Sequence, residues 1–278
     1  MPAQKVPEMP DPVMLSKIGG HMLHVLESNL TRYVVTAGVA TIILWVFARW
    51  LEIRRIQKRR ATRRDIAREI LSSVRTVGVY ALVTLITFAL REIGIVKLKL
   101  EEFTALQLVV QSLVIIVAHD AYFYWMHRAL HHRRLFRATH LHHHKSRTPT
   151  AWAAYSFSSW EAVTEILFLP IFLLITSLLG FAWVGAALLV FVWHMIIRNV
   201  IGHCGIEIYP RGWVDNRFTG WWNTVTHHDL HHSAGTYNFG LYFTWWDRWM
   251  GTEHPRYREE FRRVTERAVD AERDPLPA

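Results

Sequence analysis

Cysteine is almost absent from this sequence, since Cys204 is the only one in 278 residues. A single thiol excludes an internal disulfide and a cage of thiolate ligands, so a metal site would need nitrogen or oxygen ligands. Acidic residues are also few: 32 lysines and arginines against 23 aspartates and glutamates leave a net charge of +9, while 51% of residues are apolar. A strongly positive net charge together with a high apolar content is unusual for a soluble protein and typical of a polytopic membrane protein.

Long apolar runs predict the membrane-spanning segments. We expect spans at residues 33–51, 77–95 and 106–125, each close to the roughly 20 residues that cross about 30 Å of hydrocarbon. A longer run, residues 166–197, contains Gly180 and Gly185 and predicts a helical hairpin that enters and leaves the membrane. The expected fold is all-α: a polytopic integral membrane helical protein with a cytoplasmic histidine-rich metal-binding cap.

The same patterns divide the chain into four parts. Residues 1–32 form an N-terminal interfacial segment, for which a plain amphipathic packing helix is the alternative. Residues 33–104 hold the first two spans and a basic loop, which we interpret as a cytoplasmic anchor and not as a nucleic-acid site. Residues 105–255 carry the histidine motifs, and residues 256–278 form a charged cytoplasmic tail. From a cytoplasmic basic loop, two crossings return the chain to the cytoplasm at His127 and place every histidine cluster on that side.

Three histidine clusters dominate the sequence: HxxxH from His127, HxxHH from His140 and HxxHH from His228. Residues three and four positions apart share one face of a helix. Eight imidazoles exceed the four positions of a tetrahedral zinc, so two metal ions are the economical interpretation. Iron, copper, nickel and zinc all remain open. The residues on the shared faces are His127, His131, His140, His143, His144, His228, His231 and His232.

Other residues near the clusters are sorted by the same helical phase. Asp120 and Tyr124 fall on the stripe of His127, and we expect Asp120 to accept the free N–H of a ligating imidazole. His203 lies at the cytoplasmic return of the hairpin and could reach the cluster. Seven further histidines point away or lack companions, and we expect them outside the site: His21, His24, His119, His142, His194, His227 and His254.

Several linked motifs resemble the fatty acid hydroxylase and sterol desaturase superfamily of integral-membrane di-iron enzymes. They are His119-Asp120-x3-Tyr124-x2-His127-Arg128-x2-His131 with the two HxxHH boxes, Gly202-His203-x-Gly205-x-Glu207, Asn238-Phe239-Gly240 and Trp246-Asp247-Arg248-Trp249-Met250-Gly251-Thr252. The resemblance covers roughly residues 105–255, which would then be the catalytic domain.

The resemblance implies a di-iron centre held by histidines alone, with dioxygen as co-substrate. It implies two electrons from a cytoplasmic donor of the ferredoxin or cytochrome b5 type, and hydroxylation or desaturation of a C–H bond in a lipid from the bilayer. The box histidines become iron ligands with His203 as a further one, and Asp120 and Tyr124 become candidate catalytic residues. The membrane would be a bacterial inner membrane or the endoplasmic reticulum. A histidine-rich divalent-metal transporter is the alternative from another functional class.

Overall fold

The computed structural model describes residues 11–273, and side chains as far as residue 267. The described chain is 68% helix with almost no sheet, so the predicted all-α class is confirmed. Two-residue strands β1 (Leu98–Lys99) and β2 (Trp183–Val184) pair in parallel, Leu98 with Trp183. Short 3₁₀ turns are η1 (Glu52–Arg54), η2 (His143–Lys145), η3 (Ala151–Tyr155) and η4 (Trp213–Asp215). The helices are α1 (Pro12–Val46), α2 (Ala48–Leu51), α3 (Arg63–Val83), α4 (Leu85–Glu92), α5 (Ala105–Leu130), α6 (Phe136–Thr139), α7 (Ser159–Ile166), α8 (Phe168–Leu178), α9 (Gly185–Gly202), α10 (Val225–Ala234), α11 (Trp245–Trp249) and α12 (Tyr257–Arg273).

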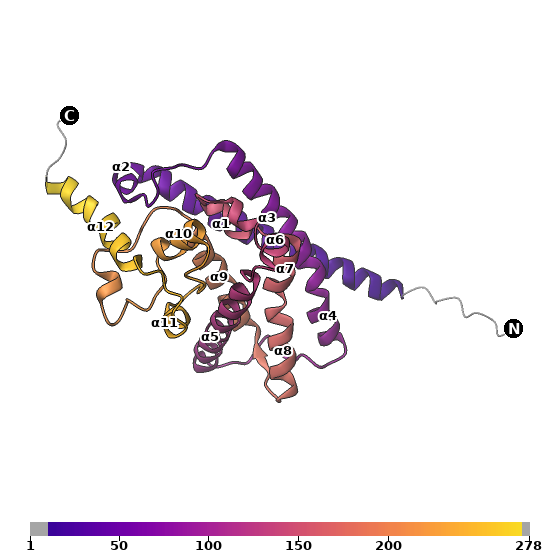
Figure 1. Ribbon diagram of the computed structural model, residues 1–278. Coiled ribbons are helices and arrows are strands. Elements are labelled where there is room, and N and C mark those ends of the chain that lie inside the picture. Colours follow the sequence, from indigo (N-terminus) through magenta and orange to yellow (C-terminus); the bar gives the residue numbers. More distant parts are fainter. Residues whose placement is uncertain (1–10, 274–278) are drawn as a thin grey trace.

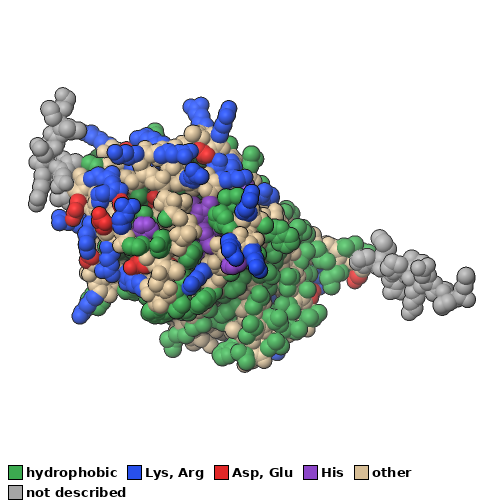
Figure 2. Space-filling model, viewed as in Figure 1, with side chains coloured by type: hydrophobic (Ala, Val, Ile, Leu, Met, Phe, Trp, Pro, Cys, Tyr) green, Lys and Arg blue, Asp and Glu red, His purple; other side chains and the backbone are tan. Residues whose placement is uncertain are grey.

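Five helical segments of the described chain are long and apolar enough to cross a membrane. They agree with the three spans and the hairpin that the sequence predicts. Figure 2 shows their hydrophobic side chains gathered on one part of the molecule, while lysine and arginine side chains cover another part with histidines among them. The segments are Pro12–Val46, Arg63–Glu92, Ala105–Leu130, Ser159–Leu178 and Gly185–Gly202.

The first segment differs from expectation because α1 is one continuous helix of 35 residues with no break between residues 32 and 33. Asn29 donates a side-chain hydrogen bond to the Val25 carbonyl inside the helix, and Tyr33 donates to the Trp152 carbonyl. The Tyr33 bond thus fixes the helix to η3 just after the expected boundary, while the Asn29 bond stays within the helix just before it. Residues 1–10 of the predicted interfacial segment lie outside the described residues.

The second segment begins earlier than its apolar run. Thr62 and Asp65 form a capping box, in which each side chain bonds the backbone N–H of the other residue. Arg63, Arg64 and Arg68 therefore lie on the first turns of α3, where the sequence predicts a loop. Apolar periodicity alone did not mark this start, because the first turns of α3 are polar.

The hairpin and the tail complete the fold. Gly180 turns between α8 and α9 with a φ of +88°, which favours glycine over residues with a side chain. The tail helix α12 is charged as predicted, but it is not fully solvated, because Tyr257, Phe261 and Val264 are buried on the inner face. Tyr257 and Phe261 pack with Val214 of η4. Residues 274–278 of the predicted tail lie outside the described residues.

The helices pack so that their loops meet at one end of the bundle. Contacts join α1 to α3 and α9, and α5 to α9, while η3 lies against α1, α3 and α9. The short helix α10 contacts both α9 and α12, and Figure 1 shows it beside the ends of the long helices. Chain segments far apart in sequence, residues 127–157 and 203–257, thus lie together there.

Candidate metal centre

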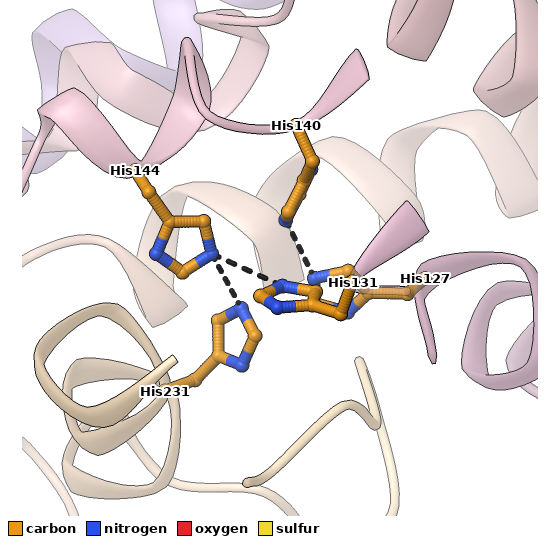
Figure 3. A group of neighbouring side chains, drawn as sticks. All are labelled: His127, His131, His140, His144 and His231. Atoms are coloured by element: carbon orange, nitrogen blue, oxygen red, sulfur yellow. Dashed lines mark hydrogen bonds between the residues drawn. The ribbon is translucent and has the colours of Figure 1, made fainter. Parts of the chain in front are cut away.

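One group of five histidines gathers between α5, the turn after α6, and α10. Its possible ligand nitrogens all lie within 4.8 Å of one another, and Figure 3 shows the rings pointing toward a common centre. The Nε2 atoms of His127 and His140 are 3.0 Å apart. The Nε2 atom of His144 lies 3.1 Å from those of both His131 and His231.

A second group of four histidines lies beside the first. His143, His203, His228 and His232 are all buried, and their ligand nitrogens also lie within 4.8 Å of one another. The His203 Nε2 is 3.3 Å from that of His143, 3.0 Å from that of His228 and 3.2 Å from that of His232. The nine histidines in the two groups are the nine that the sequence singles out as ligands.

Hydrogen bonds on the far side of the rings fix which nitrogen carries the proton. A carbonyl oxygen only accepts, so an Nδ1 atom at hydrogen-bond distance from one must be protonated. His127 donates in this way to the Phe239 carbonyl at 2.8 Å and His231 to the Tyr237 carbonyl at 2.8 Å. In the second group, His203 Nδ1 lies 2.7 Å from the Asn199 carbonyl and His143 Nδ1 lies 3.3 Å from the Ser156 carbonyl.

Neutral His143 and His203 therefore face each other with two lone pairs at 3.3 Å, an arrangement that a hydrogen bond cannot stabilise. Protonation is not the remedy, because burial and the neighbouring imidazoles lower the pKa of His143 well below its ordinary value. Burial lowers the pKa of His203 to about 4. A bound cation resolves the conflict, since a metal ion accepts both lone pairs at once.

The spacing also fits metal ligation. Two imidazoles that bind one ion at about 2.1 Å hold their nitrogens about 3.0 Å apart at a right angle and about 3.4 Å apart at a tetrahedral angle. The neighbouring Nε2 pairs in both groups fall at 3.0 to 3.3 Å. The residues present therefore suit two metal ions, one for each group, with nitrogen ligands only.

Glu161 contacts the first group and was not found by the sequence analysis. Its Oε1 atom lies 2.8 Å from the Nδ1 atom of His140, and both side chains are almost fully buried. A carboxylate on the outer nitrogen of a ligating imidazole fixes its orientation and raises its basicity. The available signal was a pair of acids one helical turn apart, Glu161 and Glu165, inside the mostly apolar segment 159–178, where an ionisable residue needs a partner.

A second buried carboxylate, that of Asp247, stabilises the turn whose carbonyls, at residues 237 and 239, accept hydrogen bonds from His231 and His127. The Asp247 carboxylate accepts hydrogen bonds from the Phe239 N–H at 2.9 Å, the Gly240 N–H at 2.8 Å and the Thr252 hydroxyl at 2.7 Å. Although burial opposes ionisation, hydrogen bonds from His227 and these groups hold the pKa of Asp247 below its ordinary value. Asp247 thus fixes the turn whose carbonyl orients His127.

The partner role predicted for Asp120 is wrong in this structure. Its Oδ1 atom accepts from the backbone N–H groups of Tyr242 at 2.9 Å and Phe243 at 3.3 Å, and bonds no imidazole. Seven residues of helix separate Asp120 from His127, a rise of about 10.5 Å, which exceeds the reach of a carboxylate. The helical spacing correctly placed Asp120 on the same stripe of α5 as His127, but the two side chains lie two helical turns apart, too far for a hydrogen bond.

Tyr124 also faces away from the histidine groups. Its hydroxyl lies 2.9 Å from the Thr252 hydroxyl and accepts a hydrogen bond from Arg128 at 3.1 Å. The ring stacks on Trp246 with centroids 5.7 Å apart. These contacts join α5 to the segment around Asp247, so the catalytic assignment of Tyr124 has no support from its geometry.

The histidines expected outside the site do lie outside both groups. The His142 Nε2 is 2.8 Å from the Ser72 hydroxyl on α3. The His227 Nε2 lies 3.5 Å from Asp247, and the His119 Nδ1 lies 3.0 Å from the Tyr242 hydroxyl. His21, His24, His194 and His254 are likewise absent from the two groups.

The chain is similar to several sterol-modifying enzymes. Delta(7)-sterol 5(6)-desaturase ERG3B of Gibberella zeae is 27% identical over 246 residues, which cover 86% of this chain and 67% of that protein. Lathosterol oxidase of Rattus norvegicus is 30% identical over 196 residues, covering 69% and 62%. Methylsterol monooxygenase erg25B of Aspergillus fumigatus is 30% identical over 158 residues, covering 52% and 48%.

The chain therefore spans about half to two thirds of the length of these relatives. No solved structure matches it. The profile of the fatty acid hydroxylase family matches residues 112–252, about half of the chain, and this range contains all nine histidines of the two groups. Together with the sterol desaturase relatives, this match shows that the chain belongs to the fatty acid hydroxylase and sterol desaturase superfamily.

Proposed function

We propose that this chain is a membrane-bound non-haem di-iron oxidoreductase that hydroxylates or desaturates a C–H bond of a lipid. The observation that carries the proposal is the pair of buried histidine groups, whose Nε2 lone pairs converge at 3.0 to 3.3 Å. An imidazole-only donor set suits several transition metals, and family membership favours iron. Iron bound there would supply dioxygen activation and removal of hydrogen from the lipid.

The protein's own residues supply binding and orientation. His127, His131, His140, His144 and His231 would hold one ion, and His143, His203, His228 and His232 the other. Backbone carbonyls bond the outer nitrogens of His127, His143, His203 and His231, and the Glu161 carboxylate lies 2.8 Å from that of His140, so that these five rings point inward before metal binds. Such preorganisation lowers the cost of assembling the site.

The setting supports a lipid substrate and a soluble electron donor. The named relatives act on sterols, and the five apolar segments give a bilayer lipid lateral access to the chain. Lysine and arginine side chains gather on the part of the surface where histidines are visible (Figure 2). Because positive residues favour the cytoplasm, we place the centre on the cytoplasmic side, facing a ferredoxin- or cytochrome b5-type donor.

Metal analysis and lipid analysis together test this function. Purified protein should contain about two irons per chain. A host strain expressing the chain should accumulate an oxidised lipid that is missing from a strain expressing His143→Ala, as measured by mass spectrometry of lipid extracts. Full occupancy by a single ion, or metal uptake by proteoliposomes without lipid oxidation, would instead support the divalent-metal transporter.

A further inference from the structure

The segment that follows α10 descends along α5 beyond the level of the metal centre. The Phe239 carbonyl accepts a hydrogen bond from the ring of His127, which fixes residue 239 beside that histidine. The Tyr242 N–H then bonds the carboxylate of Asp120. Because Asp120 precedes His127 by seven residues of α5, the chain has moved about 10.5 Å along the helix, away from the histidines.

The chain then returns toward the metal centre. The ring of Trp246 in α11 stacks on Tyr124 with centroids 5.7 Å apart, and Tyr124 lies between Asp120 and His127 on α5. Figure 1 shows α11 beside α5. Residues 239–246 thus form a loop that dips toward the middle of α5 and comes back.

The lowest part of this loop lies at the depth of a candidate membrane span. Phe243 shares a buried cluster with Phe123 of α5, and Ile116 of α5 packs against the same cluster. Both of these α5 residues belong to the candidate span Ala105–Leu130. The five candidate spans of the described chain all end by Gly202, so the loop reaches their depth without being one of them.

Backbone groups at the bottom of the loop are bonded inside the protein. The Asn223 N–H donates to the Tyr242 carbonyl and the Thr244 N–H to the Trp221 carbonyl, both at 2.9 Å. Asp120 accepts from the Tyr242 N–H at the same depth, which gives this acid a partner inside an apolar span. Non-helical backbone at membrane depth is tolerated only where protein satisfies it, and the loop meets that requirement.

The loop also joins the outer face of α5. At about 100° per residue, Val110, Val114, Val117 and Trp125 fall within about 80° of one another around the helix. All four side chains are exposed, and on a membrane span such an apolar face is the one that lipid covers. Trp246 contacts Trp125 with ring centroids 5.8 Å apart. The loop therefore extends this face at the end of the apolar run.

Three indole rings of α11 form one aromatic patch, which consists of Trp245, Trp246 and Trp249. The Trp249 centroid lies 5.4 Å from that of Trp246 and 6.3 Å from that of Trp245. Trp249 is 65% exposed, which is unfavourable in water for so large a ring. Tryptophan is enriched at membrane–water interfaces, because its ring is apolar and its N–H is polar.

We propose that residues 239–249 form a re-entrant loop whose aromatic patch lies in the interfacial layer of the bilayer. Lipid covers the patch, because the patch is continuous through Trp125 with the outer face of α5. The same loop carries the Phe239 carbonyl that orients His127, so its contact with lipid fixes the depth of the metal centre. Such membrane contact does not depend on the proposed oxidation.

A fluorophore at single cysteines tests the patch in the full, metal-loaded chain in nanodiscs. The wild type supplies the blank, since its one thiol, Cys204, is buried. NBD on Trp249→Cys should be quenched by a phosphatidylcholine that carries a nitroxide just below its headgroup. It should lose the quenching by aqueous iodide that is seen at Glu259→Cys, an exposed position of α12. Val114→Cys, on the outer face of α5, is the control for full lipid contact.

The depth of the nitroxide separates the interface from the middle of the bilayer. A lipid with the nitroxide near the end of its acyl chain should quench Trp249→Cys less than the shallow lipid does, and should quench Val114→Cys more. The reverse order at Trp249→Cys would overturn the interfacial position. Iodide quenching equal to that of Glu259→Cys would place the patch in water and overturn the proposal.

Quenching by neither iodide nor lipid would mean that protein covers the patch, such as a second copy of the chain, and would also overturn the proposal. Iron content and unfolding temperature report whether each variant folds. Should Trp249→Cys fail to fold, Met250→Cys at the C-terminal end of α11 provides the same readout, since Met250 is 39% exposed. Labelled protein is measured without an electron donor, so the result is independent of lipid oxidation.

Discussion

Replacement of Asp247 tests how the turn behind the metal centre supports it. The carboxylate is fully buried and accepts from two backbone N–H groups and the Thr252 hydroxyl. Asp247→Asn keeps the size of the side chain but exchanges one acceptor oxygen for an N–H donor. At least one buried donor then loses its acceptor.

The structure sets the expected magnitude. A buried donor left without an acceptor costs about 1–3 kcal/mol, so Asp247→Asn should lower the free energy of unfolding by about 2 kcal/mol. Asp247→Ala removes all three acceptor contacts and should cost about 4 kcal/mol or more. Because the turn orients His127 through the Phe239 carbonyl, the five-histidine group should lose metal before the four-histidine group.

The assay is chemical unfolding in detergent, with metal content measured by elemental analysis of the folded protein. Asp247→Asn should reduce metal from about two ions per chain toward one. Asp215→Asn is the matched control, since Asp215 pairs with Arg262 on a solvent-exposed face and such pairs contribute roughly 0.5 kcal/mol. Wild-type stability together with full metal content in Asp247→Asn would show that the turn does not support the site.

Three further predictions concern single positions of the centre. His143→Ala should abolish lipid oxidation and lower metal content, whereas His142→Ala should retain most of both, and equal losses would contradict the assignment of His143 to the four-histidine group. Glu161→Gln should weaken metal binding by roughly 10- to 100-fold in a chelator competition, because the carboxylate at His140 is lost, and unaltered affinity would argue against that support. Gly240→Ala should destabilise the protein in thermal unfolding, since an added Cβ would lie 2.6 Å from the Phe243 carbonyl oxygen, and an unchanged melting temperature would contradict this close approach.

The spacing rule for helices predicted the nine histidines correctly, although they lie in two kinds of local structure, α-helix and 3₁₀ turn. His127 is in α5 with His131 at its C-cap, and His228, His231 and His232 are in α10, as the spacing indicates. The middle cluster is instead a turn followed by the 3₁₀ helix η2. The i, i+3, i+4 rule still held there because both helix types bring such positions to neighbouring sides.

The residues that surround the histidines could not be predicted from sequence periodicity. Helical periodicity predicts the face of α5 on which Asp120 lies. It does not predict that the backbone of Tyr242 and Phe243 packs against that face and donates to the Asp120 carboxylate. Asn238 has a φ of +60°. Its side chain donates to the His227 carbonyl and accepts from the His254 N–H, and only the fold brings these two residues next to Asn238. Such contacts depend on how distant segments dock.

The position of α10 in the chain imposes an order on biogenesis. All five apolar segments precede Val225, and α10 supplies His231 to one group and His228 and His232 to the other. During synthesis the translocon therefore receives every described apolar segment before the last ligands leave the ribosome. Neither group is complete until then, so metal loading is a late step of maturation. A chain truncated before α10 would leave six imidazoles of the two groups without their partners in an inserted bundle, a ready target for quality-control proteolysis.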